Sequence, residues 1–199
     1  WGITGQMIGP FNVNSIMLYS VFLKPDSLNQ YSPQFSDTLS KGDVLTVNFL
    51  YPKKIEGGKK YRMYSKKNAQ WVLQGAADGL LSISKDNAAV AGQVWILEAA
   101  TDSSYLVRSG IDNNLLLTAV DSINVKLLPL NACNMNSQQF FFRETPESRY
   151  RRLTAAKYPN RIVSANARSA NQKGRDAINV FLDDEQNNEF QEFVLVEDN

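Results

Sequence analysis

Three clusters of charged side chains in this sequence are candidates for binding a cation or an anion. The run from Asp183 to Glu185 places three carboxylates in succession, either as oxygen ligands for a cation or as solvated loop charges. Residues 53–67 are rich in lysine and form either a solvated linker or a site for an anionic glycan or phosphate. Arg149, Arg151 and Arg152 would either extend this stretch into a basic face or lie as scattered surface charge.

The residue types on which most enzymes and metal sites depend are missing or isolated. The 199-residue chain has no histidine and one cysteine, Cys133. This composition removes His-based triads, the commonest general base, an internal disulfide and a thiolate zinc site. Cys133 is predicted to be a small buried or half-buried filler. We therefore expect no enzymatic activity, no cofactor and no bound metal.

Net charge and hydropathy limit the classes of partner that the sequence predicts. The formal net charge is +1, so no overall field attracts nucleic acid. No apolar run is long enough to span a bilayer. The sequence thus predicts a protein that neither binds nucleic acid nor spans a membrane.

A threefold internal repeat determines the secondary structure on which these side chains lie. A unit of roughly 45 residues recurs three times, over residues 59–101, 102–147 and 148–199. A gapless alignment starts the units at Tyr61, Tyr105 and Tyr150. Each unit closes on a Gln, any residue, and an aromatic: Gln93 and Trp95, Gln138 and Phe140, Gln191 and Phe193. A repeat of this kind indicates one structural unit that is used three times.

Each unit reads as four short strands separated by turn residues, which predicts an all-β protein. One such unit cannot bury its apolar face alone, whereas three can close into a barrel with few free edges. The closing aromatics should then meet about a pseudo-threefold axis. The closing glutamines fit positions where a side-chain amide satisfies backbone groups of a turn.

Residues 1–58 do not carry the repeat and are predicted to form a short N-terminal β arm. Residues 16–22 form an apolar run typical of a buried strand, and residues 43–51 alternate as a second strand. A long polar loop is expected between them. The arm is too small for a core of its own, so it packs either on the repeat region or on a partner protein.

The pattern of residues 59–199 resembles the β-trefoil, and its Gln-x-aromatic closings resemble the ricin B-type lectin branch of that fold. The resemblance implies a shallow sugar pocket in each unit, where an aromatic ring stacks on the sugar and polar groups bond its hydroxyls. In this sequence the matching platform is Phe181, and its implied partners are Ser164 or Asn166, with Asp183, Asp184 and Asn188 nearby. The alternative is that Phe181 belongs to the barrel.

The other two units depart from the sugar-binding pattern. The platform position holds Ser84 or Lys85 in the first unit and Lys126 or Leu127 in the second. The family's Asn before the closing Gln is replaced in every unit, by Gly92, Ser137 and Phe190. The third unit therefore carries the candidate site. Trp71, in the first unit, is either a core cap or an exposed recognition residue.

Two functions follow from these observations. The first is a secreted, non-catalytic module that attaches to a glycan or glycoprotein at a cell surface. The alternative is a protein-binding trefoil, such as the receptor-binding or accessory subunit of a toxin, an inhibitor or a cytokine-like ligand. In that alternative the partner is engaged through residues 1–58.

Overall fold

The computed structural model describes residue 47 and residues 54–101, 103–147, 149–165, 178–186 and 188–198. The strand predicted over residues 16–22 and the loop after it lie outside the described residues. Within the strand predicted over 43–51, Val47 alone is described, and it is helical and exposed rather than extended.

The described part of the chain contains twelve strands, which belong to one sheet. This confirms the expected all-β class. The first four are β1 (Lys60–Ser65), β2 (Asn68–Gly75), β3 (Leu81–Lys85) and β4 (Trp95–Ala99). The next four are β5 (Ser104–Ser109), β6 (Leu115–Ala119), β7 (Val125–Pro129) and β8 (Gln139–Glu144). The last four are β9 (Arg151–Ala155), β10 (Arg161–Ala165), β11 (Ile178–Asp184) and β12 (Phe193–Glu197). A short 3-10 turn precedes each fourth strand, at Ala91–Gln93, Met135–Ser137 and Glu189–Gln191.

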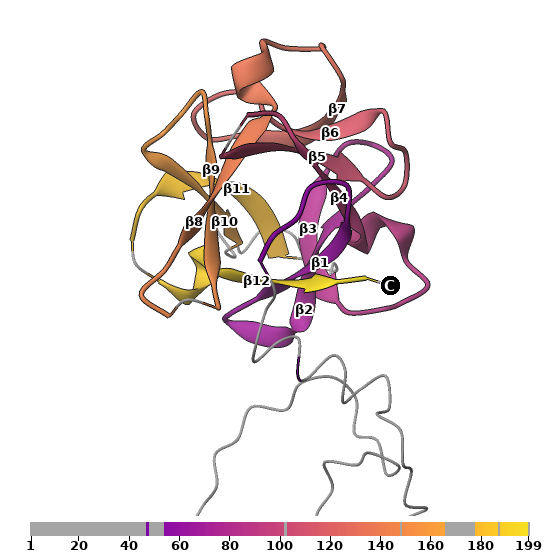
Figure 1. The fold of residues 1–199 in the computed structure, drawn as a ribbon, viewed down its shortest axis with the longest axis vertical. Coiled ribbons are helices and arrows are strands. Elements are labelled where there is room, and N and C mark those ends of the chain that lie inside the picture. The colour runs from indigo at the N-terminus through magenta and orange to yellow at the C-terminus, as the bar shows by residue number, and fades with distance from the viewer. Residues whose placement is uncertain are drawn as a thin grey trace, which may run out of the picture.

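Six strands form a closed ring. β1 pairs with β4, β4 with β5, β5 with β8, β8 with β9, β9 with β12, and β12 returns to β1, all antiparallel. Closure leaves no free edge in the ring, which is how β-barrels avoid edge-to-edge association. Figure 1 shows the three successive groups of four strands set around one centre.

The other six strands form three hairpins, β2–β3, β6–β7 and β10–β11, and each contacts a neighbouring hairpin. Leu127 N–H donates to Gly79 O at 2.8 Å, and Leu182 N–H donates to Ile123 O at 2.7 Å. β3 also pairs with the start of β11. Gly79 is required at its turn, because its φ is +84° and an added Cβ would lie 2.8 Å from Leu127 O. These contacts join the hairpins into one cyclic layer.

Strand register shows which residues are equivalent in the three units. Tyr61 lies opposite Trp95, Tyr105 opposite Phe140, and Arg151 opposite Phe193. The third unit therefore starts one residue later than the gapless alignment placed it. The predicted equivalence of Tyr150 is wrong, because this ring packs in a separate small cluster outside the barrel with Tyr64, Val72 and Val194.

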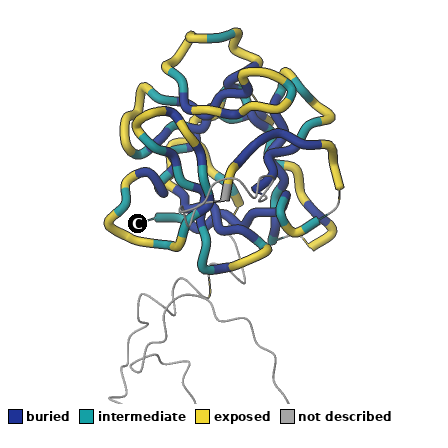
Figure 2. The backbone as a smooth tube through the Cα atoms, turned by 180° about the vertical axis from the view of Figure 1, so that it is seen from behind, coloured by how far each residue is buried: buried dark blue, intermediate teal, exposed yellow. Residues whose placement is uncertain are grey.

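The main core fills the centre of the ring with matching side chains from each unit. Trp95, Phe140 and Phe193 are fully buried in it. Figure 2 shows the buried backbone gathered inside and the exposed residues in the outlying turns. Burying one large apolar side chain stabilises a fold by about 1.5–3 kcal/mol, so repeated core positions supply much of the stability. The equivalent aliphatic positions are also fully buried: Met63, Val107 and Leu153, then Leu73, Leu117 and Val163.

The repeated glutamines hold the segment after each third strand by the same two backbone bonds. Gln191 Oε1 accepts from Gln186 N–H at 2.9 Å, and its Nε2 donates to Asp184 O at 2.7 Å. Gln93 makes the same pair of bonds with Asn87 N–H and Lys85 O, at 2.8 and 2.9 Å. In the second unit, the corresponding bonds join Gln138 to Asn131 N–H and Pro129 O, at 3.1 and 2.8 Å. The amide group thus closes one turn per unit.

Candidate functional site

The β10–β11 hairpin places three of the candidate residues on one face. Ser164 lies opposite Phe181, and Asp183 lies two residues further along β11. Side chains alternate along a strand, so Phe181 and Asp183 share a face, while Val180 and Leu182 point to the main core. Ser164, Phe181 and Asp183 expose 2%, 8% and 7% of their surfaces. Only a small part of the Phe181 side chain therefore reaches the surface.

The register also corrects the equivalence predicted for Phe181 in the first unit. Ser164 corresponds to Gln74 and Thr118, which lie opposite Ser82 and Lys126. The first-unit counterpart of Phe181 is thus Ser82, not Ser84 or Lys85. The aromatic ring remains peculiar to the third unit.

Gln186 joins the two polar candidates that lie beyond the strand. Its Nε2 donates to Asp183 Oδ2 at 3.3 Å, and its Oε1 accepts from Asn188 Nδ2 at 3.1 Å. Asp183 Oδ1 also accepts from the Asp184 N–H at 3.0 Å, and Asn188 Oδ1 accepts from the Phe190 N–H at 3.1 Å. Asp183 and Asn188 are therefore brought together through an amide that can both donate and accept.

Gln186 was not among the residues predicted from the sequence, although the sequence carries a signal for it. Its backbone N–H is held by Gln191, as those of Asn87 and Asn131 are held by the closing glutamines of their units. A side-chain amide thus recurs at this position in all three units.

Two other candidates are placed apart from this group. The Asp184 carboxylate is largely exposed and pairs with Arg161, with Oδ1 and Nη1 3.2 Å apart. Alternation along β11 directs it away from the face of Asp183. Asn166 lies outside the described residues.

The basic stretch at the start of the first unit is largely neutralised by carboxylates. Lys59 pairs with Glu197 at 3.2 Å, and Lys67 pairs with Glu189 at 3.3 Å. Lys66 contacts the carboxylates of Glu192 at 2.7 Å and Glu147 at 2.6 Å. These pairs favour the interpretation of a solvated, balanced surface over that of an anion-binding face.

The remaining candidates have simple surroundings. Trp71 is partly buried and packs against the main core. Cys133 is a free, half-buried thiol. In the parts of the chain that the structure covers, no group of three or more His, Cys, Asp or Glu side chains is arranged to hold a metal ion. The described residues also contain no helix with the length and apolar character needed to cross a membrane.

The fold is shared with solved structures of low sequence identity. No family model and no curated protein matches the chain. A mosquitocidal holotoxin has a TM-score of 0.61 at 14% identity, covering 73% of this chain and 18% of the toxin. The BEL β-trefoil has a TM-score of 0.58 at 14% identity, covering 74% of this chain and 99% of that one. The C-half of the earthworm R-type lectin, solved with GalNAc, has a TM-score of 0.51 at 11% identity, covering 70% and 99%.

These similarities show the fold, and the strand pairings agree with them. A closed ring of six strands and three hairpins, built from a thrice-repeated unit, is a β-trefoil. The predicted resemblance to the ricin B-type lectin trefoils is confirmed at the level of the fold. The chain spans less than a fifth of the mosquitocidal holotoxin that it resembles.

Proposed function

We propose that this protein is a secreted, non-catalytic carbohydrate-binding module that attaches to glycans or glycoproteins at a cell surface. The observation that carries the proposal is the third hairpin, where Phe181 and Ser164 lie opposite each other and Asp183 is linked to Asn188 through Gln186. The fold supports it, because lectins are among the structures with the same trefoil.

The chemistry of this hairpin suits a sugar. One face of a sugar ring is rich in C–H groups and packs on an aromatic ring, while its hydroxyls need partners that donate and accept. Phe181 supplies an aromatic ring, and Asp183 and Asn188 supply a carboxylate and an amide. The other hairpins have Ser82 and Lys126 in place of that ring, so we assign binding to the third unit.

A glycan array probed with the full chain tests the proposal. Phe181→Leu keeps most of the buried volume but removes the aromatic face, so we expect the folded variant to lose the glycan signal. Phe142→Leu is the matched control, because Phe142 is a half-buried ring on β8 that packs edge-on against Tyr105. Retained binding by folded Phe181→Leu, or no signal from the unmodified chain, would contradict the proposal.

A second candidate function is that of a protein-binding trefoil, such as the receptor-binding or accessory subunit of a secreted toxin complex. The similarity to a much larger mosquitocidal holotoxin and to Cry35Ab1 favours it. Exposed apolar side chains in the second unit also favour it: Ile111, Val120, Ile123, Leu130 and Met135. Such side chains are common in contacts between proteins.

Comparing the full chain with a truncated one in affinity capture tests this alternative. The boundary predicted at residue 58 lies too far along the chain for the truncation, because Gly58 N–H donates to Leu97 O at 2.6 Å and Ile55 packs on the main core. Deletion of residues 1–53 spares those contacts. Loss of a captured partner on deletion supports engagement through the arm, and capture by both forms contradicts it.

A further inference from the structure

A buried arginine lies directly beneath the loop that carries the candidate polar residues. Arg152, on β9, contacts Glu185 through Nη1 and donates from Nη2 to Glu192 Oε1 at 2.5 Å. The side chains of Arg152 and Glu192 expose 9% and 7% of their surfaces. Glu185 immediately precedes Gln186, so this ion pair fixes the backbone next to the residue that joins Asp183 to Asn188.

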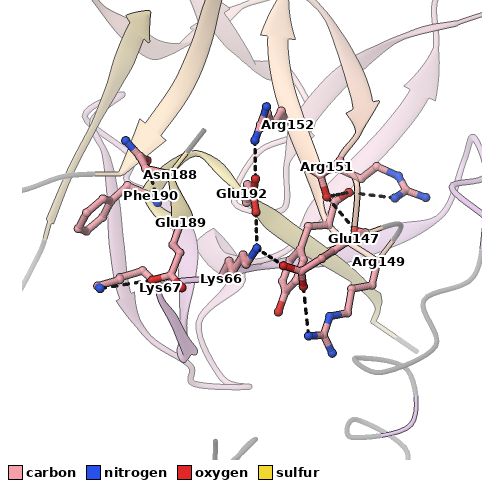
Figure 3. A network of polar contacts seen from close by, with 12 residues as sticks. Lys66, Lys67, Glu147, Arg149, Arg151, Arg152, Asn188, Glu189, Phe190 and Glu192 are labelled. Carbon is pink, nitrogen blue, oxygen red and sulfur yellow. Dashed lines mark hydrogen bonds and ion pairs between the residues drawn. The ribbon is translucent and has the colours of Figure 1, made fainter. Parts of the chain in front are cut away.

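The carboxylate of Glu192 also contacts a lysine of the first unit. Glu192 Oε2 accepts from Lys66 Nζ at 2.7 Å, and Lys66 donates to Glu147 Oε1 at 2.6 Å. Lys66 N–H also donates to the Glu192 carbonyl at 2.8 Å. Figure 3 shows Glu192 between Arg152 and Lys66. The arginine is therefore held by a carboxylate that is itself anchored, and it can hold Glu185 in turn.

The pseudo-threefold symmetry shows that the fold does not need this arrangement. In the first unit Arg62 is the equivalent residue, and its Nη1 lies 3.0 Å from Asp86 Oδ1. In the second unit the two corresponding positions are Leu106 and Leu130, which form no ion pair. One unit of the same barrel thus folds without the pair.

We propose that Arg152 is a positioning residue for ligand binding by the third unit, because it orders the loop of Glu185, Gln186 and Asn188. This inference rests on the proposed carbohydrate-binding function. Only the third unit combines the buried arginine with an aromatic ring at the position of Phe181, since the first unit has Arg62 but carries Ser82 at that position. Apparent affinity falls in proportion to the fraction of molecules whose site is ordered, so a loop ordered one-tenth of the time binds about tenfold more weakly.

The pseudo-symmetric arginines supply a matched pair of variants. Arg152→Met and Arg62→Met each remove a buried guanidinium from an equivalent place, so both are expected to lower the melting temperature. We expect only Arg152→Met to weaken binding of the glycan identified on the array, by about tenfold. Should Arg152→Met fail to fold, Glu185→Gln removes the pairing charge at a half-exposed position and is expected to weaken binding in the same direction.

Amide hydrogen exchange provides a readout that does not depend on any ligand. Arg152→Met should speed exchange at the Gln186 amide and leave the Asn87 amide unchanged, and Arg62→Met should do the reverse. Unchanged exchange at Gln186, or equal loss of binding in both arginine variants, overturns the inference. If the unmodified chain binds no glycan, the proposed function fails, and the exchange experiment still decides whether Arg152 orders the loop.

Discussion

Replacing Trp95 by Phe tests how the first unit departs from the symmetry of the core. Trp95 is fully buried, and its Nε1–H donates to Leu73 O at 2.9 Å. The equivalent positions carry Phe140 and Phe193. The substitution leaves a gap where the larger ring was and an unpaired carbonyl, which together cost about 2–4 kcal/mol.

The larger ring of Trp95 is accommodated because its neighbour on β2, Gly75, has no side chain. An added Cβ at Gly75 would lie 2.5 Å from Leu127 Cδ1 and 3.4 Å from Trp95 Cη2. The equivalent last residues of β6 and β10 are Ala119 and Ala165, in the two units whose closing aromatic is phenylalanine rather than tryptophan. Gly75→Ala alone should therefore destabilise the protein by about 1–3 kcal/mol through overpacking.

The two changes should compensate each other. In Trp95→Phe/Gly75→Ala, the smaller ring leaves room for Leu127 to move, so we expect a loss at least about 1 kcal/mol smaller than the sum of the single losses. Urea denaturation of all four proteins measures this coupling, and thermal melts should shift by roughly 2–4 °C for each kcal/mol. Additivity within about 0.5 kcal/mol would refute the size-matching explanation.

Two further predictions concern the turns and the pH dependence of stability. Gly79→Ala places a side chain at φ +84° and against Leu127 O, whereas Gly58→Ala places one at φ +81° in open space. Calorimetry should therefore show a larger loss of unfolding free energy for Gly79→Ala than for Gly58→Ala. Gly58→Ala should cost about 1–2 kcal/mol, and equal losses would contradict this argument. Burial, with the adjacent Asp86 carboxylate, raises the pKa of Tyr64 above its ordinary 10.0. The contribution of neutral, buried Tyr64 to stability is therefore complete below pH 10 and is lost as the pH rises through the folded pKa. Urea denaturation at a series of alkaline pH values should show that the unfolding free energy of Tyr64→Phe declines less steeply with pH than that of the unmodified protein. An unchanged slope would contradict the assignment.

The trefoil could be predicted because the closing motif performs the same two tasks in every unit. An aromatic in the core and an amide that closes a turn both need a particular side chain at a particular place, so the pattern persists in the sequence. The start of the third unit could not be located in this way. Tyr150 resembles Tyr61 in type, but it packs in the outer cluster, with Lys66 and Arg149 4.7 and 4.9 Å from its ring centre. Residue type alone does not distinguish these environments.

The candidate site was less accessible to prediction because it depends on register and on distant partners. The sequence indicated an aromatic on the third hairpin, but a shift of two residues in the first unit changed its counterpart from Ser84 to Ser82. The contacts of Glu192 with Lys66 join residues 126 positions apart, and no local pattern reports such a pair. The burial of Phe181 likewise depends on the whole fold.

The pairing of the first and last strands has a mechanical consequence. Tyr61 lies opposite Glu197 and Ser65 opposite Phe193, so β1 begins beside the place where β12 ends. A force that pulls apart the chain before β1 and the chain after β12 would break the hydrogen bonds between these two strands one after another instead of all at once. At the loaded end, Asp198 N–H donates to Lys60 O at 2.9 Å and Arg62 Nε donates to Asp198 Oδ1 at 2.9 Å. In force spectroscopy the barrel should therefore open at low force, and the contacts of Asp198 with β1 and of Ile55 and Gly58 with the barrel should break first.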